Sequence, residues 1–152
     1  MEEMTRGYDA PSLHVLDIVA EFALIETAAA VRNANTIALG GDEVLAKILS
    51  KIVADDTRQA EVFAKIGDEA FEVVPDQMAR AISDRVQGFA IPVVDLPSKA
   101  NSTAALAEAG IYDDDQQRDK VFKPVLARWN FFGRDDLGDE GKKAREEIAH
   151  LA

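Results

Sequence analysis

Glu26 is the one charged side chain within an apolar stretch that has the periodicity of a helix. At about 100° per residue it falls on the face that Val19 and Phe22 occupy, and no other charge lies between Phe22 and Val31. The pattern therefore predicts a carboxylate that points into the protein.

The segment ADDTRQ, residues 54–59, shows the same feature in the next helical stretch. Asp56 and Gln59 share a face with Leu49 and Phe63, which are apolar. The sequence therefore predicts that a second carboxylate, together with an amide, also points inward.

Burying an ionised carboxylate is costly, so buried acids are normally protonated, paired with a cation or bound to a metal. Two inward acids on neighbouring helices are typical of the carboxylate cages of ferritin-like metal proteins. Two alternatives to a metal site remain open at this point. Arg58 or Arg32 reaches across to form an ion pair, or Glu26 is neutral.

Two long helices must position these side chains. Pro11 and Ser12 predict the start of the first helix, because proline suits a first helical turn and serine can cap it. The helical pattern then runs without a breaker to about Leu39. Gly40-Gly41 predicts a tight turn at its end.

Asp42 is a natural N-cap for the second helix, which the apolar spacing extends to about Val74. Gly67 is a predicted weak point within it, because glycine disfavours helix interiors. The two helices are expected to be antiparallel, since the turn between them is short.

Shorter helices are predicted for the rest of the chain, and no stretch predicts a strand. They cover residues 75–88, 101–109, 113–132 and 139–151, with a crossing loop at 91–99. Pro124 predicts a kink in the third of these. The expected fold class is all-α, in a single domain over residues 1–152 with a flexible segment at 1–10.

Composition excludes several classes of function. The net charge of −11 argues against nucleic acid and anionic membranes as partners, and the apolar runs are too short and too charged to span a bilayer. Without cysteine there is no disulfide framework and no thiolate metal site. Because the acidic N-terminus is unlike a leader, the expected location is the cytoplasm.

Charge is unevenly distributed along the chain. Residues 118–145 hold eight bases against five acids, so an anionic partner would meet this segment. A solvated amphipathic surface is the commoner origin of such a pattern.

The order of these motifs resembles the C-terminal half of the soluble acyl-acyl carrier protein desaturases. Glu26 is followed by Asn35-Thr36 and then by ALGGDEVLAKILSKIVADDTRQ, at residues 38–59. Further segments follow in the family's order: AEAGIY (107–112), ARWNFF (127–132) and DEGKKAREEIAHL (139–151). The resemblance covers residue 16 to the end, and it implies a ferritin-like half bundle.

In that family a lone glutamate on one helix and D-E-x-R-H on the next supply half of a diiron site. The resemblance places Glu26 at the lone glutamate, Asp56 at the glutamate of E-x-x-H, and Gln59 at the histidine. Glutamine is a poor substitute for imidazole on iron, and aspartate reaches one methylene less far than glutamate. The two histidines, His14 and His150, lie near the termini.

The activity that the resemblance implies is oxidative. Such an enzyme uses two irons, dioxygen and electrons from ferredoxin to remove hydrogens from an acyl chain on acyl carrier protein. On this resemblance, five side chains would line the acyl channel: Phe22, Ala29, Ala30, Ile52 and Phe63.

Three hypotheses follow, because the sequence supplies two long helices where the bundle needs four. In the first, a desaturase-like partner forms a heterodimer with this chain and completes a split desaturase site that includes Glu26 and Asp56. In the second, a metal-free pseudoenzyme homodimerises or stabilises an active desaturase. In the third, a homodimer binds manganese or magnesium through carboxylates alone. All three predict an oligomer that buries the apolar faces of the long helices.

Overall fold

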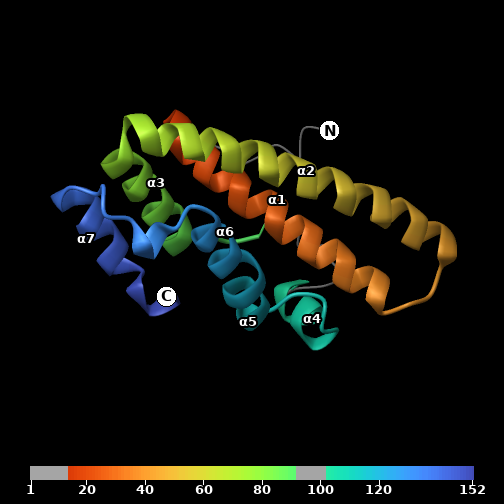
Figure 1. Ribbon diagram of the computed structural model, residues 1–152. Helices are drawn as coiled ribbons and strands as arrows, with labels where there is room; N and C mark the ends of the chain where they lie inside the picture. Colours follow the sequence, from red (N-terminus) through yellow and green to blue (C-terminus); the bar gives the residue numbers. More distant parts are fainter. Residues whose placement is uncertain (1–13, 92–101) are drawn as a thin grey trace, which may run out of the picture.

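Two long helices dominate the protein, shown in Figure 1 as a computed structural model that describes residues 14–91 and 102–152. They are α1 (Val15–Ala38) and α2 (Glu43–Val73), with 24 and 31 residues. Shorter helices follow: α3 (Pro75–Gln87), α4 (Ser102–Glu108), α5 (Asp114–Gln116), α6 (Lys123–Arg128) and α7 (Asp139–Glu147). The described residues form no strand, which confirms the all-α prediction.

The first described residue, His14, caps α1. Its side chain accepts a hydrogen bond from the backbone N–H of Leu16, and its own N–H donates to Asp17 at 3.2 Å. The predicted start at Pro11 and Ser12, the flexible segment at 1–10 and most of the loop at 91–99 lie outside the described residues.

The turn between α1 and α2 lies at the two glycines where the sequence predicts it. Gly40 and Gly41 have φ of 77° and 118°, a region that favours glycine. The Asp42 carboxylate then accepts hydrogen bonds from the N–H groups of Val44 and Leu45 at 2.7 and 2.9 Å. The predicted cap is therefore confirmed.

Helix α2 runs without interruption through Gly67, as the apolar spacing predicts, and a lower helix stability at this glycine stays a prediction. Gly67 lets the Trp129 ring lie against the helix, because a Cβ there would stand 2.6 Å from Cζ2 of the tryptophan. The indole Nε1–H also donates to the Ala64 carbonyl at 3.0 Å. The sequence suggests a flexible position at this glycine, whereas the structure uses it as the site where Trp129 packs on α2.

Pro124 lies directly after a change in helix type, and a kink there stays a prediction. A π-helical segment, Gln117–Phe122, precedes α6, and Lys123 N–H donates to the Arg118 carbonyl five residues back. Because proline has no N–H to donate, a widened turn accommodates it. The helix predicted over 113–132 ends at Arg128, and the one predicted over 139–151 ends at Glu147.

The hydrophobic core lies on one side of the α1–α2 pair. There α1 meets α3, the π-helical segment Gln117–Phe122 and α6, and α7 packs against α3 (Figure 1). Fully buried side chains of this core include Leu24, Met78, Ile82, Leu126 and Ile148. In the described part of the chain, no helix is both long and apolar enough to cross a membrane.

Candidate functional site

Glu26 on α1 and Asp56 on α2 approach each other across the two long helices. Asp56 is 9% exposed, and its Oδ2 accepts a hydrogen bond from the Asn33 side-chain amide at 3.1 Å. Partial burial raises the pKa of Glu26, and the negative charge of Asp56 raises it further. The structure thus brings together the two acids that the sequence singled out.

Neither acid has the cationic partner that the sequence left open. Arg58 is exposed and pairs with Asp55 on its own helix at 2.8 Å. Arg32 lies near the buried Tyr112, and its charge partly offsets the effect of burial, which raises the pKa of that hydroxyl to about 12. Within residues 14–91 and 102–152, no ion pair involves Glu26 or Asp56.

Asn33 is the site residue that sequence reasoning missed. It lies seven residues after Glu26, two helical turns along the same face, so helical spacing alone would have placed it beside the acids. The amide satisfies one oxygen of Asp56 without adding charge.

Gln59 does not join the two acids. Its side chain is exposed, beside Val62 and Phe63 at a shallow surface hollow of about 370 Å³. The expectation that it points inward is wrong for the chain alone, while a role as a metal ligand remains a prediction.

The donor set on this chain is too small for a diiron centre. Among the described residues, no group of three or more Asp, Glu, His or Cys side chains is arranged to hold a metal ion. Two carboxylates, one already holding an amide, fit at most part of a site for a hard cation. No step of a reaction through iron follows from these residues alone.

The predicted channel residues line an open surface. Phe22 is 39% exposed and stacks on Phe63 with ring centroids 5.1 Å apart, and Ile52 is 38% exposed. Ala29 and Ala30 are half-buried. An acyl channel at this place needs a second layer of protein above it, so the channel remains a prediction.

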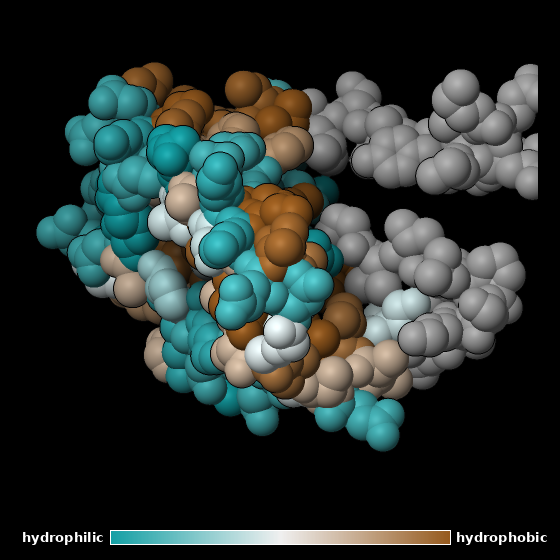
Figure 2. Space-filling model, turned by 90° about the vertical axis from the view of Figure 1, so that its right-hand side faces the viewer, coloured by the Kyte–Doolittle hydropathy of each residue, from teal (hydrophilic) through white to brown (hydrophobic). Residues whose placement is uncertain are grey.

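This open apolar face extends along both long helices. Its members are large hydrophobic residues that water reaches: Val15, Ile18, Phe22, Leu45, Ile48, Ile52, Val62 and Ile66. Figure 2, viewed onto the end where α1 and α2 join, shows hydrophobic side chains (brown) interrupting the hydrophilic surface. Exposed apolar areas of this extent mark sites of interaction.

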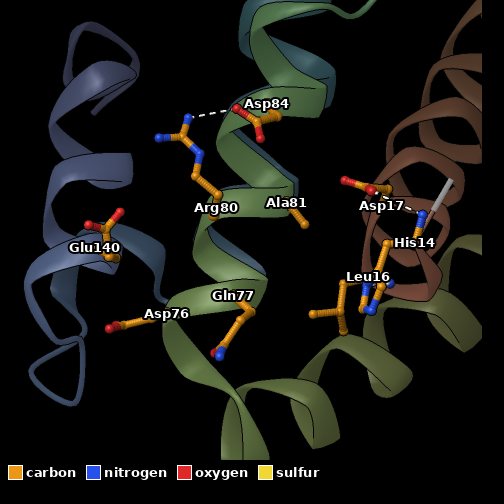
Figure 3. Close-up of a pocket in the computed structure, with 9 residues that line it drawn as sticks. All are labelled: His14, Leu16, Asp17, Asp76, Gln77, Arg80, Ala81, Asp84 and Glu140. Carbon is orange, nitrogen blue, oxygen red and sulfur yellow. Dashed lines mark hydrogen bonds and ion pairs between the residues drawn. The ribbon is translucent and has the colours of Figure 1, made fainter.

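A separate hollow of about 540 Å³ lies between α1, α3 and α7 (Figure 3). Arg80 projects from α3 beside it and bonds Asp84 and, on α7, Glu147, whose pKa that guanidinium lowers to about 2. The hollow contains neither Glu26 nor Asp56. The ion pair between Arg80 and Glu147 joins α3 to α7.

The family described as fatty acid desaturase matches residues 15–152 of this chain. Acyl-acyl carrier protein desaturase DesA1 of Mycobacterium tuberculosis is 27% identical over 98% of this chain and 46% of that protein. Acyl-acyl carrier protein desaturase 4 of Oryza sativa, a chloroplast protein, is 30% identical over 86% of this chain and 34% of that protein. The chain therefore spans between a third and a half of the length of these curated relatives.

The fold is also that of a solved desaturase. The crystal structure of acyl-ACP desaturase DesA2 from Mycobacterium tuberculosis matches all of this chain and 58% of its own, with a TM-score of 0.75 and 18% identity. The match shows a common ferritin-like fold, of which this chain forms part.

Proposed function

The chain belongs to the fatty acid desaturase family, and we propose that it is one subunit of an acyl-acyl carrier protein desaturase-type oxidoreductase. In this proposal it contributes Glu26 and Asp56 to a site that a partner polypeptide completes. The observation that carries the proposal is the approach of these two acids beside an uncovered apolar face. Function then depends on a second layer of helices.

The residues of this chain have distinct roles in that complex. Asn33 fixes one oxygen of Asp56, which leaves the other free to bind. Glu26 holds a proton more readily than an exposed glutamate, because burial raises its pKa. Phe22 and Phe63 form an apolar surface suited to an acyl chain.

The iron that the family resemblance implies would bind only in the complex. We expect the purified chain alone to retain far less than the two irons of a complete site, because its described residues hold no group of three or more Asp, Glu, His or Cys side chains arranged for a metal ion. Elemental analysis tests this. Near-stoichiometric iron in the isolated chain would show that its oxygen donors suffice.

Reconstitution with the part of a desaturase that this chain does not match tests the proposed activity. The chain is co-expressed with the part of DesA1 that it does not match, and iron content and desaturation of carrier-bound acyl chains are measured. We expect an iron-containing complex from which Glu26→Gln removes iron. The matched control is Glu21→Gln on the same helix, whose side chain faces Arg85. Iron binding that Glu26→Gln leaves unchanged contradicts the assignment.

A metal-free scaffold is the second candidate, and the Asn33–Asp56 hydrogen bond favours it. The bond satisfies the buried acid without metal, and Gln59 faces away from it. A scaffold that homodimerises or stabilises an active desaturase would show the same urea midpoint with chelator, manganese or magnesium. A midpoint raised by manganese or magnesium would instead support a homodimer that binds a hard ion through carboxylates.

A further inference from the structure

The exposed side chains of α2 form one continuous stripe. Its positions alternate in steps of three and four residues, the spacing of helices that pack side by side. They are Leu45, Ile48, Ile52, Asp55, Gln59, Val62 and Ile66, and the structure leaves all of them exposed. The stripe is therefore apolar at both ends and polar in its middle.

Three pairs of stripe positions lie symmetrically about Thr57, whereas Leu45, twelve residues before it, has Glu69 at the matching position. Ile48 and Ile66 lie nine residues to either side, and Ile52 and Val62 lie five residues to either side. The polar pair, Asp55 and Gln59, lies two residues to either side.

Such symmetry has a geometric consequence. When two copies of a helix pack antiparallel about a two-fold axis, each residue meets the residue equally far beyond the axis. Ile48 then meets Ile66 of the second copy, Ile52 meets Val62, and apolar side chains cover each other. Asp55 meets Gln59, whose amide N–H groups can donate to the carboxylate.

We propose that a second copy of this chain covers the open face. The two α2 helices pack antiparallel, with the two-fold axis at the level of Thr57 and on the side of the helix opposite to that side chain. The exposed α1 residues Val15, Ile18 and Phe22 add to the same interface. The result is a four-helix bundle made of α1 and α2 from each copy.

The area of the open face suffices for a stable dimer. Helix α2 has 31 residues, so it is roughly 46 Å long, and paired helices stand roughly 8–10 Å apart. Helix α1 has 24 residues and is roughly 36 Å long, so the two helices together present roughly 650–800 Å² per copy, which is close to the size of a standard stable interface.

This inference rests on the proposed function in one respect, since a desaturase-like partner would occupy the same face. The homodimer is the form of the chain when that partner is absent. Its tests use the purified chain without metal, acyl carrier or partner, so their failure is distinguishable from failure of the proposed activity.

Cysteine cross-linking tests the register, because the natural sequence has no cysteine. Ile48→Cys and Ile66→Cys are made as separate variants, and each is oxidised alone and after mixing. We expect a disulfide-linked dimer in the mixture only, since the two copies of residue 48 would lie roughly 27 Å apart. Cross-linking of Ile48→Cys alone, or none in the mixture, overturns the proposal.

Sedimentation of charged variants tests the interface itself. At micromolar concentration the natural chain should sediment as a dimer, and Ile52→Glu should weaken the dimer at least about a hundredfold, because both copies then bury a charge. Ala54→Glu, on the exposed opposite side of α2, should leave the dimer unchanged. Circular dichroism confirms that the variants remain helical. A monomeric natural chain, or a dimer that Ile52→Glu leaves intact, overturns the proposal.

Discussion

The two sides of the α1–α2 pair differ in whether their apolar side chains are buried or exposed to water. On the closed side, α3, the π-helical segment Gln117–Phe122 and α6 cover α1, and Leu24 is 1% exposed. On the open side, Phe22, two residues earlier on the same helix, is 39% exposed although its ring is stacked. One side therefore stabilises the chain by itself, and the other is left for association.

Replacing one phenylalanine on each side by alanine measures this difference most directly. Phe71→Ala removes a ring that is 1% exposed, that packs near Trp129, and that lies 4.0 Å below the Arg134 guanidinium. We expect it to lower the free energy of unfolding by about 3–5 kcal/mol, as large-to-small changes in cores do. Phe22→Ala should cost about 1 kcal/mol in the monomer, because its ring is partly in water already.

Urea melts at several protein concentrations provide the measurement. If a second copy covers the open face, the cost of Phe22→Ala rises with concentration while that of Phe71→Ala does not. Equal costs for the two substitutions in dilute protein would show that the two sides are not different in the way described.

Gly67→Ala tests the contact that connects α2 to the closed side. Alanine favours a helix over glycine by about 1 kcal/mol, but the added Cβ would stand 2.6 Å from the Trp129 ring. We expect the clash to dominate and to cost about 1–3 kcal/mol in urea melts.

A second variant separates the clash from the change in helix propensity. In a Trp129→Phe background the smaller ring should tolerate alanine, and the effect of Gly67→Ala should shrink or become stabilising. A cost that persists in this background would assign the effect to the backbone.

Local signals account for what could be predicted from the sequence. The turn at Gly40-Gly41, the cap at Asp42 and the start of α3 at Pro75 each depend on the conformation of a few adjacent residues, and all three agree with the structure. The inward direction of Asp56 follows from helical periodicity, which is equally local.

Contacts between distant segments could not be predicted from the sequence. Helix propensity makes Gly67 a weak point, but Trp129, 62 residues later, determines its role. Periodicity turns Gln59 inward because it shares a face with Asp56, yet α1 covers only part of that face. Periodicity shows which residues lie on one side of a helix, and only packing shows how far the neighbouring helix extends over them.

The smallest expected effects on stability come from substituting Glu26 and Asp56, the two acids that face each other across α1 and α2. The pKa of Glu26 is raised above its unfolded value, so the folded state favours the protonated form. Stability from this group is present below the unfolded pKa and is lost as the pH rises through the folded pKa. Glu26→Gln should therefore raise stability at pH 7 relative to the natural chain by less than about 1 kcal/mol, since the site is partly exposed, and should have no such effect near pH 4.

Asp56→Asn provides the companion measurement. Its amide oxygen can still accept the hydrogen bond from Asn33, so we expect stability to stay within about 0.5 kcal/mol of the natural chain when chelator is present. The exposed substitution Glu69→Gln is the control for the loss of one negative charge. A loss of about 3–5 kcal/mol in both acid variants would instead reveal a buried ion pair that the amides break. The acids would then hold the two helices together structurally, and their proposed contribution to a shared site would be wrong.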